Sequence, residues 1–200
     1  MPQASQDIPT RLKRAAAELF AAGGPDGTTI DEIARLAGVN RERVYAYFGG
    51  KDGLFASVLG DELLAIAEAV TLDAASIADI GDFAGRLFDY HTDNPRLQRL
   101  LQWEALHFGS RPVPDEVERR KHYQLKVDVI ADAQRDGMLS DEIPPGDLLF
   151  LLIAIAAWWS AVPQIVRMTD RGSRTASTAA RRRRSSAVRA AELLARSKPS

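Results

Sequence analysis

The strongest constraint on this chain is an apolar repeat of about 3.6 residues that continues through almost the whole sequence. Between glycine and proline breaks, apolar residues recur at helical spacing, as at Leu12, Ala15, Ala16 and Leu19. No run of alternating apolar and polar residues is bounded by hairpin turns, as strands would require. The sequence therefore predicts an all-α protein.

The breaks between periodic segments predict where each helix begins and ends. Thr29-Ile30-Asp31-Glu32 has the capping-box pattern, and Asn40 is a candidate N-cap for the helix that follows. A Ser/Thr/Gly-rich stretch over residues 170–180 predicts a loop. The helices predicted in this way cover residues 8–22, 29–37, 41–48, 52–70, 77–91, 95–108, 114–136, 146–168 and 185–196.

The composition excludes several classes of protein. The 200 residues contain no cysteine and three histidines, which excludes a disulfide framework, a zinc finger and a thiol nucleophile. The N-terminus lacks the apolar segment of a secretory signal, and the longest apolar run, residues 148–159, is shorter than the roughly 18–20 residues that span a bilayer. We therefore expect a cytoplasmic protein without a cofactor, a metal or a membrane partner.

The net charge of -1 hides an uneven distribution along the chain. Residues 1–55 are neutral, residues 56–147 carry a net charge of -9, and residues 148–200 carry +8. Because nucleic-acid binding depends on the charge of one face, the balanced total does not exclude a DNA partner.

Residues 29–48 have the pattern of a helix-turn-helix unit, two short helices joined by a tight turn at Gly38. Small Ala34 and Ala37 permit a close crossing with the preceding helix over residues 8–22. The outward face of the second short helix combines arginines with tyrosines, which suit guanine edges and phosphate oxygens in a major groove.

The segment TTIDEIARLAGVNRERVYAYFGGKDGLF, residues 28–55, resembles the DNA-binding signature of TetR-type transcriptional regulators. A Thr pair, an Ile-Ala, an Ala-Gly-Val turn, a Tyr, a Phe and a Lys stand at the spacings of that family. The resemblance implies an N-terminal three-helix DNA-binding domain over residues 1–55. It also implies a larger helical domain over residues 56–200 for effector binding and dimerisation.

The resemblance also implies which residues contact DNA. The start of the third helix would read bases through Arg41, Glu42 and Arg43. Phosphates would be contacted by Thr29, Tyr45, Tyr47 and Lys51. The other interpretations are that the arginines and Lys51 are solvated surface charges and that Tyr45 is a packing residue.

Two positions depart from the family pattern. Asn40 stands where the family usually has Ser, and Glu42 stands where it has a small residue or Pro. A glutamate near phosphates is unfavourable unless it accepts a hydrogen bond from a cytosine amino group or pairs with Arg41 or Arg43. The family's base preference is therefore not transferred to this chain.

The C-terminal part of the sequence predicts a homodimer. Residues 148–162 are apolar all round, which predicts burial on every side, and small residues such as Ala154 and Ala161 permit close helix approach. Two copies of this helix and of the last helix would form a four-helix interface. The alternative is a core helix of a monomer.

Aromatic residues on three helices are candidates for an effector pocket. Ordinary core packing explains the same aromatic residues, so both interpretations stay open. Residues 94–109 faintly resemble the pyrimidine-utilisation branch of the family, and no pyrimidine ligand is inferred from them. The predicted ligand-binding residues are Trp103, His107, Tyr123 and Trp159.

Together these patterns predict a ligand-responsive regulator, a repressor by resemblance, that binds a pseudo-palindromic operator as a dimer and is released by a small molecule. One alternative is a regulator without a small-molecule ligand. Another is a metal-dependent helical-bundle enzyme, because Glu104 and His107 have the i, i+3 spacing of di-iron sites. A single such motif is too few for that site, so no catalytic residue is predicted.

The run Arg181 to Arg184 is a further charge feature. Four like charges ahead of a helix N-terminus oppose the helix dipole, which favours a flexible solvated loop before the last helix. A nucleic-acid contact is the alternative interpretation.

Overall fold

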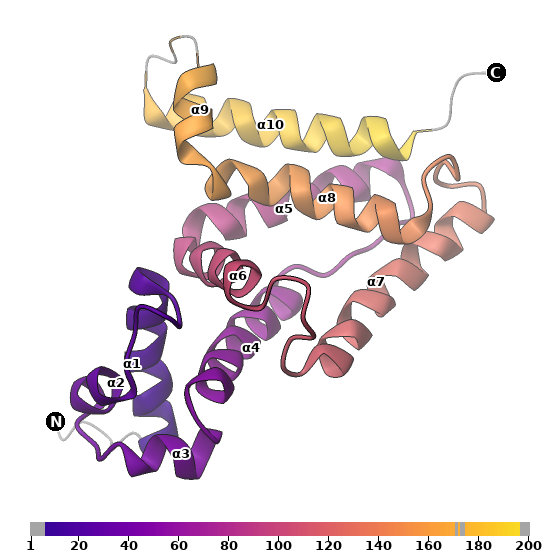
Figure 1. Cartoon of the computed structure of the whole chain (residues 1–200). Helices are drawn as coiled ribbons and strands as arrows, with labels where there is room; N and C mark the ends of the chain where they lie inside the picture. The colour runs from indigo at the N-terminus through magenta and orange to yellow at the C-terminus, as the bar shows by residue number, and fades with distance from the viewer. Residues whose placement is uncertain (1–6, 171, 173–174, 197–200) are drawn as a thin grey trace, which may run out of the picture. The chain divides into compact units, whose positions relative to one another are not determined.

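The computed structural model describes residues 7–170, 172 and 175–196, and every regular element in those residues is an α-helix (Figure 1). This confirms the predicted all-α class. The helices are α1 (Ile8–Gly23), α2 (Ile30–Ala37), α3 (Glu42–Phe48), α4 (Lys51–Ala69), α5 (Ile77–Asp93), α6 (Pro95–Phe108), α7 (Glu116–Arg135), α8 (Pro145–Ala161), α9 (Pro163–Thr169) and α10 (Ala176–Ala195).

The predicted helix over residues 146–168 is wrong as a single element. It is divided into α8 and α9, which are bent by 85° at their junction. Pro163 occupies the first turn of α9 and has no N–H to donate to the preceding turn, so the helix cannot continue through it. Val162 before it has φ -128° and ψ 61°, which lie outside the helical region.

The predicted loop around Arg181 to Arg184 is also wrong. Helix α10 begins at Ala176, where the Thr175 side chain accepts a hydrogen bond from the Thr178 N–H, so the four arginines lie inside the helix. Arg182 and Arg183 both pair with Asp170, which neutralises part of the charge run. Carboxylates that are distant in the sequence, at Asp170 and Asp89, therefore stabilise the run of arginines inside the helix, although the helix dipole alone disfavours these cations.

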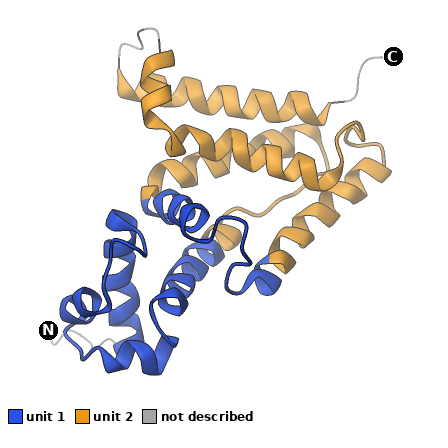
Figure 2. Ribbon diagram, in the orientation of Figure 1, with its two compact units in different colours: residues 1–65, 96–119 blue, residues 66–95, 120–200 orange. Residues whose placement is uncertain are grey.

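The chain divides into two compact units (Figure 2). Unit 1 comprises residues 1–65 and 96–119, and unit 2 comprises residues 66–95 and 120–200. Helix α6 thus belongs to the same unit as the N-terminal helices, although it follows α5 in the sequence. A functional division at residue 55 stays a prediction.

Unit 1 is built around fully buried aromatic and aliphatic side chains. Phe20 of α1 meets Phe55 of α4 edge-to-face, with ring centroids 5.2 Å apart, and Phe55 also lies 6.5 Å from Phe108 of α6. Edge-to-face pairs of this kind add stability beyond the burial of their area. These rings join α1, α4 and α6. Leu12, Ile33 and Val44, on α1, α2 and α3, are also fully buried.

Unit 2 is a bundle in which α5 packs against α8 and α10. Its core includes Ile80, Phe83 and Leu152, together with alanines of α10. Gly85 permits close packing, because a Cβ atom there would lie 2.8 Å from the Arg184 guanidinium and 3.1 Å from Val188. The same guanidinium donates to Asp89, so α5 and α10 are joined by both packing and charge.

Among the described residues no single helix is long and apolar enough to cross a membrane; only the sharply bent pair α8 and α9 reaches that length and hydropathy together.

Two glycines with a positive φ but different ψ, 176° at Gly24 and -10° at Gly49, provide a test of unit 1 packing. Gly24 has φ 71° and Gly49 has φ 73°, but a Cβ at Gly24 would lie 2.6 Å from the Trp103 ring, whereas a Cβ at Gly49 meets nothing within 4 Å. We expect Gly49→Ala to lower the free energy of unfolding by about 1–2 kcal/mol through left-handed strain alone. Gly24→Ala should cost about 1–3 kcal/mol more, because its ψ of 176° lies in a region almost restricted to glycine and because the new Cβ overpacks against Trp103. Urea denaturation of both variants checks this, and equal losses would contradict the observed Trp103 contact.

Candidate nucleic-acid interface

Helices α2 and α3 form the predicted helix-turn-helix, and the turn between them is held by both backbone and side chain. Gly38 has the left-handed conformation, φ 64° and ψ 43°, and its N–H donates to the end of α2. Arg11 of α1 donates from Nε to the Ala37 carbonyl at 3.0 Å and from Nη2 to the Gly38 carbonyl at 2.8 Å. Arg11 was not predictable from the sequence, because its partners are 26 and 27 residues away and no local pattern marks them.

The predicted cap at Asn40 is wrong. Helix α3 begins at Glu42, its N-cap position is Arg41, and no side chain caps it. Backbone turns replace the side-chain cap, because the Arg43 N–H donates to the Asn40 carbonyl at 3.1 Å and the Val44 N–H donates to the Arg41 carbonyl at 3.0 Å. The Asn40 amide therefore forms no cap hydrogen bond with α3.

The predicted DNA contacts lie on the accessible side of these helices. Val44 is fully buried and anchors α3, whereas its neighbours point outward. Tyr45 and Tyr47 are 49% and 47% exposed, so neither is a core residue. Arg41 lies 3.6 Å from the Asp31 carboxylate of α2, with both side chains exposed. The exposed members of the predicted set are Thr29, Arg41, Glu42, Arg43, Tyr45 and Tyr47.

Thr29 and Lys51 are brought together at the starts of α2 and α4. Lys51 is partly buried, and its Nζ donates to the Thr28 carbonyl at 3.2 Å. Thr29 caps α2, since its Oγ1 accepts from the Glu32 N–H at 3.2 Å, and the Glu32 carboxylate accepts in return from the Thr29 N–H at 2.9 Å. The predicted capping box is therefore confirmed.

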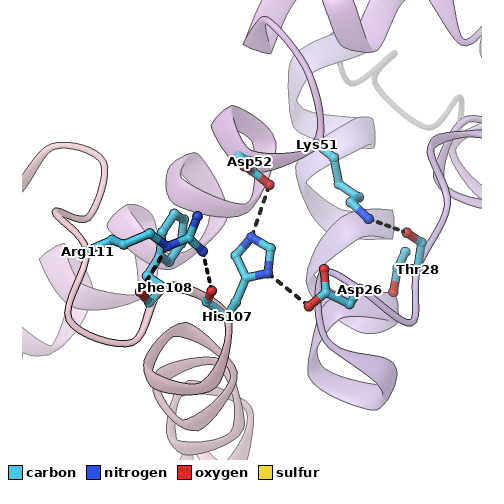
Figure 3. A network of polar contacts seen from close by, with 7 residues as sticks. All are labelled: Asp26, Thr28, Lys51, Asp52, His107, Phe108 and Arg111. Carbon is cyan, nitrogen blue, oxygen red and sulfur yellow. Dashed lines mark hydrogen bonds and ion pairs between the residues drawn. The ribbon is translucent and has the colours of Figure 1, made fainter.

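The network behind these helix starts was not foreseen from the sequence (Figure 3). His107, in the last turn of α6, lies between two carboxylates of unit 1. Its Nδ1 is 3.1 Å from Asp26 in the turn after α1, and its Nε2 is 3.3 Å from Asp52 at the start of α4. The hydrogen bond from His107 is the main cause that lowers the pKa of Asp26. No sequence pattern connects these residues, which are 81 and 55 positions apart.

Helix α6 has further contacts with the rest of unit 1. Trp103 lies against Gly24 at the end of α1, and Arg96 forms an ion pair with Glu62 of α4. Arg99 donates to the Ala22 carbonyl at 3.4 Å. The helix thus contacts the end of α1, the turn after it, and α4 along much of its own length.

Comparison with known proteins agrees with this architecture. Residues 12–58 match the family model described as bacterial regulatory proteins, tetR family, and residues 79–192 match the tetracyclin repressor-like C-terminal domain. The HTH-type transcriptional repressor SCO4008 of Streptomyces coelicolor is 44% identical over 158 residues, which cover 79% of this chain and 81% of that protein. The chain belongs to the TetR family of transcriptional regulators.

Other TetR-family proteins are similar over comparable lengths. The regulator RutR of Escherichia coli K12 is 30% identical over 161 residues, 78% of this chain and 75% of RutR. The crystal structure of the regulator SCO4942 from Streptomyces coelicolor superposes with a TM-score of 0.77 at 33% identity, covering 94% of this chain and 98% of that one. A Bacillus subtilis FadR structure in complex with stearoyl-CoA shares the fold, with a TM-score of 0.67 and 14% identity over 94% of this chain and 99% of FadR.

The four predicted effector contacts of this TetR-family chain are divided between the units. Trp103 and His107 belong to unit 1 and make the contacts described above. Tyr123 of α7 and Trp159 of α8 belong to unit 2, where Tyr123 is 43% exposed and Trp159 packs against the core. Trp159 also lines a largely apolar groove of about 670 Å³ between α8, α9 and α10. The effector role of all four residues stays a prediction.

The metal-enzyme alternative finds no support in this TetR-family chain. Glu104 forms a bidentate ion pair with Arg119, in which Nη1 donates to Oε1 at 2.6 Å and Nη2 donates to Oε2 at 2.9 Å. In the described part of the chain no group of three histidine, aspartate or glutamate side chains could hold a metal ion. The matched families and relatives are transcriptional regulators, so the chain is a regulator and not an enzyme.

The capping box predicts a pH-dependent contribution to stability. Hydrogen bonds from Thr29 hold the pKa of the Glu32 carboxyl below its usual value. The stabilisation is therefore present above that usual value and is lost as the pH falls through the lower folded-state pKa. We expect Glu32→Gln to lower the urea midpoint at pH 7 and to lower it less at pH 4.

The matched control is Glu18→Gln, on the exposed side of α1. Urea denaturation of the three proteins at both pH values makes the comparison. If Glu32→Gln lowered the urea midpoint more at pH 4 than at pH 7, the stabilising role of the ionised Glu32 carboxylate would be contradicted.

Proposed function

We propose that this TetR-family chain is a ligand-responsive repressor that binds a pseudo-palindromic operator as a homodimer. The observation that carries the proposal is the exposed face of α3, where arginines and tyrosines flank a buried Val44 anchor. A helix held by one buried residue and presenting cations and hydroxyls on its other faces suits insertion into a major groove.

The DNA contacts divide into base readers and phosphate contacts. At the N-terminal end of α3, Arg41, Glu42 and Arg43 are exposed and in the position from which a recognition helix reaches base edges. Glu42 then serves as an acceptor for a cytosine amino group, which would make it a source of sequence preference. The phosphate contacts in this proposal are Thr29, Tyr45, Tyr47 and Lys51.

The dimer is supported by apolar surface on α8 and α10. The expected burial of residues 148–162 on every side is not met within one chain, because Phe150 and Trp158 are 71% and 60% exposed. Leu193 of α10 is also exposed. Large apolar side chains gathered on two packed helices are typical of an interface, and a two-fold axis would cover them with the same helices of a second chain.

The effector is a small molecule that binds the helical remainder of the chain. It can shift DNA affinity only by binding the DNA-competent and DNA-incompetent states with different affinities. Trp103 and His107 contact the turn after α1, so an effector that reached them would act directly on unit 1. Relatives in Streptomyces and Pseudomonas are named repressors, which favours repression in the cytoplasm over activation.

A regulator without a small-molecule ligand is the second candidate. The observation that favours it is the large number of internal contacts that α6 already makes, including Arg96 with Glu62 and His107 with two carboxylates. In that case DNA binding responds to the solution conditions rather than to a bound small molecule.

Substitutions of two cations should separate phosphate contacts from base contacts. Lys51→Ala should weaken binding to all duplexes alike and reduce the salt slope by about one. Arg43→Ala should relax the preference at one base position by about 1–3 kcal/mol. Fluorescence anisotropy over a salt series measures both, with Arg135→Ala on α7 as the exposed-arginine control. Unchanged affinity in both variants would show that α3 is not the reading helix.

Charge on α8 should separate the chains of the dimer. Phe150→Arg places a cation on a side chain that is 71% exposed, so the fold of the single chain tolerates it while an apolar interface does not. We expect sedimentation velocity to report a monomer, with operator affinity reduced. Val117→Arg, at a site 75% exposed on α7, is the control and should stay dimeric. A Phe150→Arg protein that stayed dimeric would place the interface on other helices.

A further inference from the structure

The position of His107 raises a question that the proposed function does not answer, because both of its ring nitrogens face carboxylates. The His107 side chain is only 13% exposed, whereas Asp26 and Asp52 are 81% and 60% exposed. Its ring is packed edge-on against Phe108, with centroids 4.7 Å apart. The imidazole is therefore the enclosed centre of the network, and the two carboxylates converge on it from different elements (Figure 3).

The proton count of the ring decides how many of these contacts are hydrogen bonds. A neutral imidazole has one N–H and one lone pair, so it can donate to Asp26 or to Asp52 but not to both. The imidazolium form has two N–H groups and can donate to both at the observed 3.1 Å and 3.3 Å separations. Only the protonated ring can therefore donate hydrogen bonds to both Asp26 and Asp52.

The two carboxylates lie next to groups that the proposed function places on DNA. Asp26 lies three residues before Thr29, the N-cap of α2, and Asp52 directly follows Lys51 in α4. Lys51 itself donates to the Thr28 carbonyl, so the starts of α2 and α4 are already tied to each other. A ring that bonds both carboxylates fixes α6 to the same two helix starts.

The other charged groups at this site are cations. Lys51 and Arg111 both contribute to lowering the pKa of Asp26 through their charge. Arg111 also donates to the His107 and Phe108 carbonyls, at 2.5 Å and 3.2 Å, and its guanidinium lies 5.6 Å from the centre of the Phe108 ring. With a neutral ring the two carboxylates balance the two cations, and protonation of His107 leaves one net positive charge beside the proposed phosphate contacts.

We propose that His107 is a positioning residue for DNA binding, whose protonated ring bonds Asp26 and Asp52 together and thereby holds the starts of α2 and α4 in the DNA-binding arrangement. The proposal rests on the proposed function, since it assumes that Thr29 and Lys51 contact phosphates. Because only the doubly protonated ring donates to both carboxylates, operator affinity should rise as the pH is lowered.

Few other groups of the chain complicate a measurement between pH 6 and pH 8. Burial lowers the pKa of His91 to about 4, so that ring stays neutral over the whole range. His122 is exposed on α7 and serves as the control histidine. The α-amino group also titrates in this range, but it is common to every variant.

The experiment measures operator affinity of the full chain at pH 6 and pH 8 at constant ionic strength, by fluorescence anisotropy with a duplex selected for specific binding. Wild type should bind about two- to fivefold more tightly at pH 6, the size expected for partly exposed ion pairs. His107→Gln should lose this ratio, because glutamine keeps a donor but does not titrate. His122→Gln should keep it.

Asp26→Asn and Asp52→Asn form the second arm, because they retain the histidine and remove one carboxylate charge. Each should reduce the ratio of affinities while leaving helix content unchanged by circular dichroism. Equal ratios in wild type and His107→Gln, with specific binding intact, would overturn the role of His107 and leave the proposed function standing. Loss of specific binding by wild type at both pH values would instead overturn the proposed function.

Discussion

The contact between Phe20 and Phe55 is the interaction on which the DNA-binding part of the molecule depends. It holds the start of α4 against α1, with the ring centroids 5.2 Å apart and both side chains fully buried. Because α2 and α3 also pack on α1, this contact and the Lys51 hydrogen bond to the Thr28 carbonyl together set where Lys51 lies relative to the helix-turn-helix. Phe108 extends the same aromatic cluster to α6. The exposed face of α3 is therefore presented by a rigid support rather than by a free pair of helices.

Interactions between near neighbours in the sequence were predictable, and interactions between distant residues were not. The capping box joins Thr29 to Glu32, three positions further on, and was predicted from the residue types alone. The same local reasoning failed at Pro163, where a continuous apolar pattern outweighed the one residue that ends α8, and at Thr175, a cap hidden in a loop-like composition. Arg11 and His107 find their partners only after folding, so no pattern in the sequence could indicate them.

Both units leave large apolar side chains on their surfaces, but only unit 2 has them on the packed helices α8 and α10. Unit 1 encloses its aromatic cluster, and its exposed tyrosines lie on α3. Unit 2 encloses a core between α5, α8 and α10 but leaves Phe150, Trp158 and Met168 on its surface. A helix pair with a buried face and a second apolar face has the composition expected of an interface between chains. The two faces give α8 a structural role within one chain and a proposed role between two chains.

Selection of bound duplexes from a random library tests the central claim most directly, because it assumes neither the operator nor the effector. A homodimer that places α3 of each chain in a major groove should enrich an inverted repeat whose half-sites are separated by about one helical turn or slightly more. Enrichment of a single asymmetric site, or of no sequence at all, would contradict the account of this chain as a dimeric, groove-reading member of the TetR family.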